Sequence, residues 1–184
     1  MVVYISLLRG INVSGQNKIA MPELRQLYES LGFGDIQTYV QSGNVIFTSQ
    51  PTDEALLAQA IEARIEQQFG FTLPVFIRDV QGFERMIAGN PFLNREVEDP
   101  TLLHVTFLYQ AAPVKKLLDT TSPNPDGDEF VPGERDIYLF CPNGYGRTKL
   151  NNSFFERQLK VAATTRNWKT VKALVELARG MITG

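Results

Sequence analysis

Cysteine and histidine are almost absent from this chain of 184 residues, which contains one of each, Cys141 and His104. A single cysteine cannot form an intramolecular disulfide, and it fits a reducing cytosol. Cys141 lies in the apolar run IYLFCP, which predicts a small buried core residue. His104 alternates with apolar residues in an expected strand, and without a second histidine or a cysteine pair the sequence indicates no metal site. No Ser-His-Asp or Cys-His catalytic arrangement is legible either.

Long hydrophobic runs and targeting signals are lacking as well. The N-terminal segment MVVYISLLRGIN has no basic region before its apolar residues, and the apolar run is far too short to span a bilayer. We therefore expect a cytoplasmic protein with no targeting segment and no membrane partner. The length and the hydrophobic fraction of 43% are enough to bury a core, either in one domain or in two small ones.

An excess of charge of one sign is also lacking, because the formal net charge is only −2. This balance argues against broad, sequence-independent binding of nucleic acid, which needs an overall basic face. The charges are nevertheless segregated: residues 145–184 carry eight Lys/Arg against two acids, whereas residues 96–136 carry nine acids against three Lys/Arg. The basic segment contains GRTKLNNS and TTRNW, and such guanidinium and amide groups can share the oxygens of one phosphate or carboxylate. The sequence therefore predicts an anion site without naming a reaction.

The same order of elements is expected twice along the chain. Hydrophobic periodicity, turn residues and helix-capping residues predict the elements. In the first half we expect strands at 2–8, 36–41, 44–48 and 73–78, and helices at 22–31, 53–69 and 80–89. After an acidic, proline-containing linker that ends near Pro100, we expect strands at 102–109, 129–131, 137–141 and 161–164, a short helix at 113–118, another opened by a Ser153–Glu156 capping box, and a last helix at 168–179.

This repeated β-α-β-β-α-β order is the split βαβ, or ferredoxin-like, order. We therefore predict an α+β fold of duplicated ferredoxin-like units, residues 1–95 and 96–184, each with an antiparallel sheet and helices on one face. Right-handed crossovers make the first two strands of each unit parallel. The loop Arg9–Ala20 and the turn Gln41–Asn44 are then expected at one end of the first sheet. The loop Pro142–Asn152 and the segment Thr165–Asn167 are likewise expected together at one end of the second.

The candidate ligand-binding residues fall in these four segments. The first loop is rich in glycine and asparagine and can line an anion pocket, although its spacing matches neither the P-loop nor GxGxxG. The segment GYGRTKLN leads into a helix N-terminus beside two cations, which is a good anion seat. The candidates are Arg9, Asn12, Lys18, Gln41, Ser42, Asn44, Arg147, Lys149, Asn151, Thr165, Arg166 and Asn167.

Each segment also has a structural interpretation. Arg9 can pair with a carboxylate in a turn, and the residues QSGN are those that a tight hairpin needs. Asn151 can organise the turn before its helix, and Asn167 most simply caps the last helix. Trp168 is expected to be a core anchor rather than a stacking platform.

Five motifs of the chain resemble those of a known family. LLRGINV, KIAMPELRQLYESLGF, TYVQSGNVIF, GRTKL and ATTRNWKTV are similar, in this order and through nearly the whole chain, to the motifs of domain-of-unknown-function (DUF) family 1697. The resemblance implies a bacterial, mostly stand-alone protein whose family lacks an established activity. The signature positions that it implies are Arg9, Gly10, Asn12, Gln41, Ser42, Gly43, Asn44, Arg147, Lys149, Thr165, Arg166, Asn167 and Trp168.

Four functions stay open at this point. The first is binding of a small anionic ligand, such as a nucleotide, another phosphorylated metabolite or a short RNA end. The second is an enzyme acting on such a ligand, with Arg and Lys stabilising transition-state charge. The third is binding of single-stranded RNA, although the segment Ser42–Phe47 lacks the aromatic residues of that signature. The fourth is an interaction scaffold. No cofactor is expected, and the sequence indicates no oligomeric state.

Overall fold

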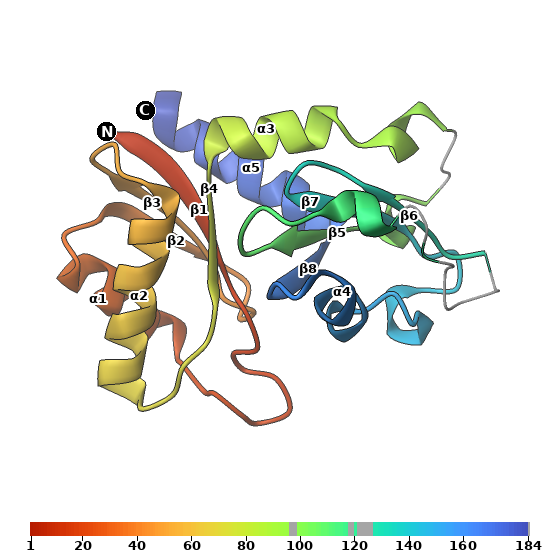
Figure 1. Cartoon of the computed structure of the whole chain (residues 1–184). Helices are drawn as coiled ribbons and strands as arrows, with labels where there is room; N and C mark the ends of the chain where they lie inside the picture. The colour runs from red at the N-terminus through yellow and green to blue at the C-terminus, as the bar shows by residue number, and fades with distance from the viewer. Residues whose placement is uncertain (96–98, 118–119, 121–126, 184) are drawn as a thin grey trace. The chain divides into compact units, whose positions relative to one another are not determined.

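The computed structural model describes residues 1–95, 99–117, 120 and 127–183 of the chain (Figure 1). The chain divides into two units: unit 1 is Met1–Glu84 with Leu174–Gly184, and unit 2 is Arg85–Ala173. This division differs from the expected one near residue 95. It falls inside helix α3, Val80–Ala88, and inside helix α5, Trp168–Thr183. Both divisions fall within a continuous helix, so neither has the proline- or glycine-rich linker that usually marks a domain boundary in a sequence.

Unit 1 contains a four-stranded antiparallel sheet with the strand order β2-β3-β1-β4. Its elements are β1 Val2–Leu8, α1 Met21–Ser30, β2 Gly34–Tyr39, β3 Asn44–Ser49, α2 Glu54–Phe69 and β4 Val75–Asp79. Helix α2 begins and ends where the sequence predicts. The Asp53 carboxylate accepts hydrogen bonds from the backbone N–H groups of Ala55 and Leu56, and Gly70 ends the helix with a φ of 76°.

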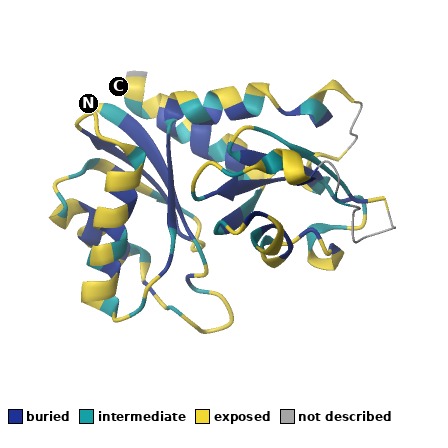
Figure 2. Ribbon diagram, viewed as in Figure 1, coloured by how far each residue is buried: buried dark blue, intermediate teal, exposed yellow. Residues whose placement is uncertain are grey.

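Helices α1 and α2 pack on the same face of this sheet (Figures 1 and 2). Alternate residues of the strands point toward them because side chains alternate across a strand. The buried cluster includes Tyr4, Leu8, Val45, Phe47, Val75 and Ile77 of the sheet, Leu24, Leu27 and Tyr28 of α1, and Leu57, Ile61 and Ile65 of α2. Each fully buried large apolar side chain contributes about 1.5–3 kcal/mol to folding. Within the cluster the hydroxyls of Tyr28 and Ser6 lie 2.7 Å apart, and burial raises the pKa of Tyr28.

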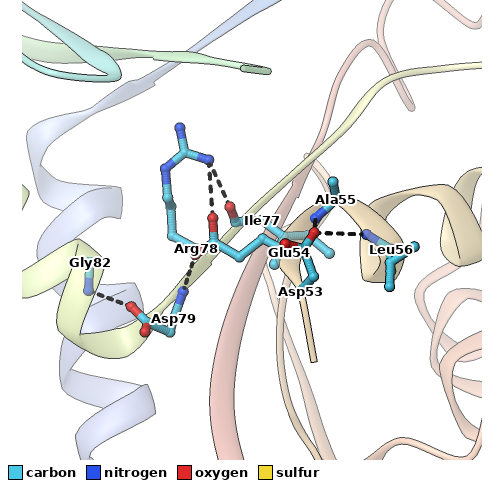
Figure 3. A network of polar contacts seen from close by, with 8 residues as sticks. All are labelled: Asp53, Glu54, Ala55, Leu56, Ile77, Arg78, Asp79 and Gly82. Carbon is cyan, nitrogen blue, oxygen red and sulfur yellow. Dashed lines mark hydrogen bonds and ion pairs between the residues drawn. The ribbon is translucent and has the colours of Figure 1, made fainter. Parts of the chain in front are cut away.

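A polar network in unit 1 joins the N-terminus of α2 to the end of β4 (Figure 3). The Arg78 side chain is buried; its guanidinium donates to the carbonyl oxygen of Ile77 at 2.7 Å and lies 4.0 Å from a Glu54 carboxylate oxygen. The other Glu54 oxygen accepts from the backbone N–H of Asp79 at 3.0 Å, and Asp79 accepts from Gly82 at 2.6 Å. The buried cation is thus compensated, and the first turn of α3 is tied to β4.

Unit 2 contains a second four-stranded antiparallel sheet, with the order β6-β7-β5-β8. Its strands are β5 Leu103–Leu108, β6 Glu129–Pro132, β7 Asp136–Phe140 and β8 Ala163–Asn167. One α-helix, α4 Asn152–Leu159, lies between β7 and β8, and four short 3-10 helices are described: η1 Pro91–Asn94, η2 Pro100–Leu102, η3 Val114–Leu117 and η4 Tyr145–Arg147. Phe154, Phe155 and Leu159 of α4 and Leu117 of η3 pack against one face of the sheet. Residue 118 of the expected helix 113–118 and residues 96–98 of the expected linker lie outside the described residues.

Two sequence predictions for unit 2 are wrong in detail. The last strand runs from Ala163 to Asn167 instead of 161–164, so Thr165–Asn167 are strand residues rather than a following loop. The predicted Ser153–Glu156 capping box does not form. Asn151 is the N-cap and accepts from the backbone N–H of Phe154, whereas Glu156 accepts from the N–H of Ala163. Asparagine and serine are equally good N-caps, so the sequence alone does not choose between Asn151 and Ser153.

Cys141 follows β7 and is buried in the core of unit 2, as the sequence predicts. Burial, together with the Asp128 carboxylate, raises the pKa of Cys141 to about 11. At about pH 8 only about one thiol in a thousand is then ionised, and the thiolate is the reactive form. We expect the native protein to resist alkylation by iodoacetamide at this pH, and the urea-unfolded protein to be alkylated within minutes, as mass spectrometry measures. Rapid alkylation of the native protein would contradict the buried position.

Candidate functional site

The loop after β1 and the β2–β3 turn meet at one end of the sheet of unit 1. Leu7 is paired with Asn44 across the two central strands, and the backbone N–H of Leu8 donates to the carbonyl oxygen of Gly43 at 2.8 Å. The Asn12 side-chain amide donates to the carbonyl oxygen of Gln41 at 2.9 Å. These contacts confirm that the segments 9–20 and 41–44 lie side by side, as the right-handed crossover predicts.

Asn12 holds the two segments together. Its side-chain amide nitrogen donates to the carbonyl oxygens of Ile19 and Gln41, both at 2.9 Å, and its side-chain oxygen accepts from the N–H of Ile19 at 3.0 Å. A carboxamide has two amide hydrogens, so both donors are used within the fold. Asn12 therefore organises the loop, and its side chain has no donor left for a ligand.

The loop is built from residues in the left-handed backbone conformation. Asn17 donates from its side chain to the carbonyl oxygen of Gly10 at 3.2 Å, and Gln16 N–H donates to Val13 O at 3.0 Å. The residues with positive φ in the two segments are Gly10, Asn12, Ser14, Gly15, Asn17 and Gly43, and Val40 directly before the turn also has a positive φ. For the β-branched Val40, a φ of 52° costs on the order of 1–3 kcal/mol. Strain of this kind gathers at functional sites, so it supports a hypothesis of function here.

A pocket of about 520 Å³ opens between this loop, the turn and the start of α1. The residues that line it are Asn12, Gly15, Lys18, Ile19, Ala20, Met21, Pro22 and Gln41. Lys18 and Gln41 are exposed and bring a cation and a carboxamide. At the first turn of α1 the N-cap is Ala20, which has no side-chain acceptor; the Glu23 carboxylate accepts from its N–H at 3.3 Å. The lining thus combines hydrogen-bond donors with an apolar wall.

Three of the six candidate residues predicted for unit 1 line this pocket, and three do not. Asn12, Lys18 and Gln41 line the pocket, whereas Arg9, Ser42 and Asn44 are not among its lining residues. Asn44 is fully buried and donates to the carbonyl oxygen of Tyr39 at 3.1 Å and to the hydroxyl of Ser42 at 2.8 Å, so it shapes the hairpin. The other lining residues are Gly15, Ile19, Ala20, Met21 and Pro22, none of which was a sequence-predicted candidate. Pro22 did predict the helix start directly after the loop, but a helix start alone does not indicate that its first residues line a pocket.

A second cluster lies at one end of the sheet of unit 2, where the loop after β7 approaches the end of β8. The Thr165 hydroxyl donates to the side-chain oxygen of Asn152 at 2.7 Å and lies 2.8 Å from the Thr106 hydroxyl. Because a threonine hydroxyl has one hydrogen, Thr106 is the donor to Thr165. The rings of His104 and Tyr145 stack with centroids 4.7 Å apart, and burial lowers the pKa of His104. The predicted association of these two segments is confirmed.

The three cations predicted for this cluster are placed differently. Arg147 and Lys149 are exposed. Arg166 is partly buried, and its guanidinium donates to the Thr164 hydroxyl at 2.9 Å and to the carbonyl oxygen of Thr165 at 3.0 Å. Strand alternation places its side chain on the opposite face from that of Thr165. Burial lowers the pKa of Arg166 to about 10, and the Tyr145 phenol opposes this shift. The convergence of all three cations on one anion stays a prediction.

The remaining candidates of unit 2 have capping roles. Asn151 is the N-cap of α4, and the side-chain oxygen of Asn167 accepts from the N–H of Thr170 at 2.8 Å, in the first turn of α5. Trp168 is only 2% exposed, which confirms it as a core anchor. Within the part of the chain that the structure describes, no group of three or more His, Cys, Asp or Glu residues could hold a metal ion.

Thr165→Val is expected to destabilise the protein by about 1–3 kcal/mol. The substitution removes the hydrogen bond to Asn152 and leaves the buried Thr106 hydroxyl without its acceptor. Urea denaturation followed by circular dichroism measures the effect. Thr165→Ser keeps the hydroxyl and is the control, so it should lose less. Equal losses in both variants would mean that the methyl group, not the hydrogen bonds, stabilises this position.

Together these features define an α+β protein with two four-stranded antiparallel sheets, whose loop pocket lies at one end of the first. The chain belongs to the family described as Protein of unknown function (DUF1697), whose sequence profile matches residues 1–138, as the motifs predicted. It is similar to the solved structure of a conserved bacterial protein, SP0830 from Streptococcus pneumoniae, at 26% identity and a TM-score of 0.75; the match covers 96% of this chain and 98% of that one. No curated protein matches. Among the described residues, no helix has the length and apolar character needed to cross a membrane.

Proposed function

We propose that this protein binds a small anionic ligand, such as a nucleotide or another phosphorylated metabolite, in the pocket of unit 1. The Asn12 side chain makes hydrogen bonds to Ile19 and Gln41, which we call the Asn12 clasp. The observation that carries this proposal is that this clasp links the segments that bring Lys18 and Gln41 to the same 520 Å³ pocket. Pockets that hold small molecules in proteins have about 300–1,000 Å³ and combine apolar walls with a few placed polar groups. The pocket of unit 1 meets both conditions.

The electrostatics of the lining favour a negative ligand. Lys18 is exposed and has no ion-pair partner among the described residues, so its charge is available. The N–H groups at the start of a helix carry a partial positive charge, which adds to the field of the lysine. Binding of RNA by base stacking has less support, because the exposed large hydrophobic side chains of the described residues, Met1, Val13, Val40, Leu56, Leu93 and Ile182, include no aromatic ring.

The binding test compares two lysines that carry the same charge. Lys18→Met keeps the aliphatic stem and removes the ammonium group, and we expect it to weaken binding of a nucleotide found by thermal-shift screening about tenfold, as titration calorimetry measures. Lys172→Met removes an equally exposed charge from the part of α5 in unit 2, and it should leave the affinity unchanged. At a ligand concentration about a hundredfold above its dissociation constant, binding adds about 2.7 kcal/mol of stability, which the screen detects.

Two results would contradict the proposal. The first is the absence of any thermal shift with nucleotides, sugar phosphates and inorganic phosphate at millimolar concentration. The second is an equal loss of affinity in Lys18→Met and Lys172→Met, because a general effect of net charge would then explain the binding.

We also infer that the two halves of the chain are duplicated ferredoxin-like units, divided near residue 95. The strand orders β2-β3-β1-β4 and β6-β7-β5-β8 correspond position by position. Each last strand is followed at once by a helix, α3 after β4 and α5 after β8, and this repeated order supports a division after α3 and before β5. The single buried cysteine supports a cytoplasmic location.

A further inference from the structure

We infer that the pocket of unit 1 selects an anion of low charge attached to an apolar body, such as a phosphodiester nucleotide or an aromatic carboxylate, and disfavours polyphosphates. This inference rests on the proposed function of the same pocket. Three properties of the pocket indicate the class of ligand: the number of cations in its lining, its volume and its apolar lining residues.

The number of charges in the lining sets the charge of the ligand. Among the described residues that line the pocket, Lys18 is the only cation. Arg9 belongs to the same loop but does not line the pocket. The Glu23 carboxylate does not line it either, but it accepts from the N–H of Ala20, which is a lining residue. One cation can neutralise one negative charge. The further charges of a polyphosphate would find no second cation among these lining residues, and an unpaired charge that loses water is costly.

The other polar side chains of the lining, Asn12 and Gln41, are uncharged, so they can orient a ligand but cannot neutralise its charge. The side-chain donors of Asn12 are committed to Ile19 and Gln41, so Asn12 cannot bind a second phosphate oxygen. The Gln41 side chain is exposed and has both a donor and an acceptor, which suits a neutral polar group on the body of the ligand. Polyphosphate sites in proteins, in contrast, surround their ligand with successive backbone N–H groups and several cations.

The volume of the pocket and its apolar lining residues favour a ligand with an apolar organic group. Its volume of about 520 Å³ lies within the range of about 300–1,000 Å³ that holds whole organic molecules in proteins. The consecutive residues Ile19 to Pro22 make up the apolar part of the lining, in which Ala20, Met21 and Pro22 are more exposed than Ile19. A flat or aliphatic group against this stretch removes apolar surface from water, which is favourable in proportion to the area buried. Inorganic phosphate alone leaves this stretch uncovered.

The experiment compares four probes with the full chain by titration calorimetry. They are adenosine 3′,5′-cyclic monophosphate with one negative charge, phenylacetate with one negative charge, ATP with up to four, and adenosine with none. We expect the singly charged probes to bind at least about tenfold more tightly than ATP and adenosine. The comparison of the cyclic nucleotide with phenylacetate tells whether the anion is a phosphodiester or a carboxylate. Lys18→Met should weaken the singly charged probes about tenfold and leave adenosine unchanged.

The Glu23→Gln variant tests the charge argument directly. It removes the negative charge at the first turn of α1 and keeps a side chain that can accept from Ala20 N–H, so we expect it to strengthen ATP binding several-fold more than binding of the cyclic nucleotide. If ATP binds the wild type more tightly than both singly charged probes, the inference on charge is overturned while anion binding stands. If only adenosine binds, or if none of the probes binds, the proposed function fails together with the inference.

Discussion

Gly43→Ala is expected to destabilise the protein by about 3–5 kcal/mol, the largest effect of a single methyl group that the structure predicts. A Cβ atom at this position would lie 2.7 Å from the Cβ of Leu8 and 2.9 Å from the Cδ1 of Ile11. Both side chains are buried and cannot move aside without disturbing the core of unit 1. The backbone φ of 75° adds a further cost for any residue with a Cβ.

The control for this prediction is Gly10→Ala in the same pair of segments. Gly10 has nearly the same φ, 73°, but a Cβ there would meet no atom within 4 Å. It should cost only the backbone term, about 1–2 kcal/mol. Urea denaturation of both variants gives the difference, which isolates the close approach of the turn to Leu8 and Ile11. If the two variants lose the same stability, the packing at Gly43 is looser than these distances state.

Asn12→Ala is expected to cost about 2–4 kcal/mol and to abolish ligand binding in the pocket of unit 1. The substitution removes three hydrogen bonds and leaves the N–H and the carbonyl oxygen of Ile19, a residue only 2% exposed, without these partners. The backbone of residue 12 has a φ of 55°, a left-handed conformation that asparagine adopts more readily than alanine, so the substitution also adds a conformational cost. The loss of the link to Gln41 separates the two segments that form the pocket.

Asn17→Ala is the matched control for Asn12→Ala. Asn17 has a φ of 47° in the same loop, but its side chain makes one described hydrogen bond, 3.2 Å to the carbonyl oxygen of Gly10. It should lose about 1 kcal/mol and keep measurable binding. Calorimetric unfolding and titration of both variants separate the cost of the backbone conformation from that of the clasp. Equal losses of stability would show that the conformation, and not the hydrogen bonds of Asn12, accounts for the effect.

The sequence predicts unit 1 well because its signals are local and independent of one another. Asp53 and Gly70 bound α2 as predicted, since a capping side chain and a left-handed residue act on their own helix. The meeting of the loop after β1 with the β2–β3 turn follows from the handedness of a crossover, which depends on no particular residue. Three of the pocket's lining residues were predicted: Asn12 and Lys18 as polar residues of a glycine-rich loop, and Gln41 as a polar residue of the hairpin turn.

The parts that the sequence could not predict depend on tertiary contacts. Nothing in TTRNW distinguishes a strand end from a loop, because β8 is defined by its pairing with β5 across a long sequence separation. The buried position of Asn44 was also not visible, since a polar residue in a hairpin motif reads as exposed until its amide is seen to bond Tyr39 and Ser42. The apolar residues that line the pocket were also not predicted, because Met21 and Pro22 indicate only the start of a helix and not that they face a pocket.

The membership of residues 174–184 in unit 1 has a consequence for synthesis on the ribosome. The sheet, α1 and α2 leave the exit tunnel early, but the last two turns or more of α5, with the Arg179 guanidinium that bonds Glu84 at 2.7 Å, follow only after all of unit 2 has been translated. The N-terminal segment therefore cannot complete this part of its structure until α5 has been translated. A ribosome stalled within unit 2 would hold an incomplete unit 1.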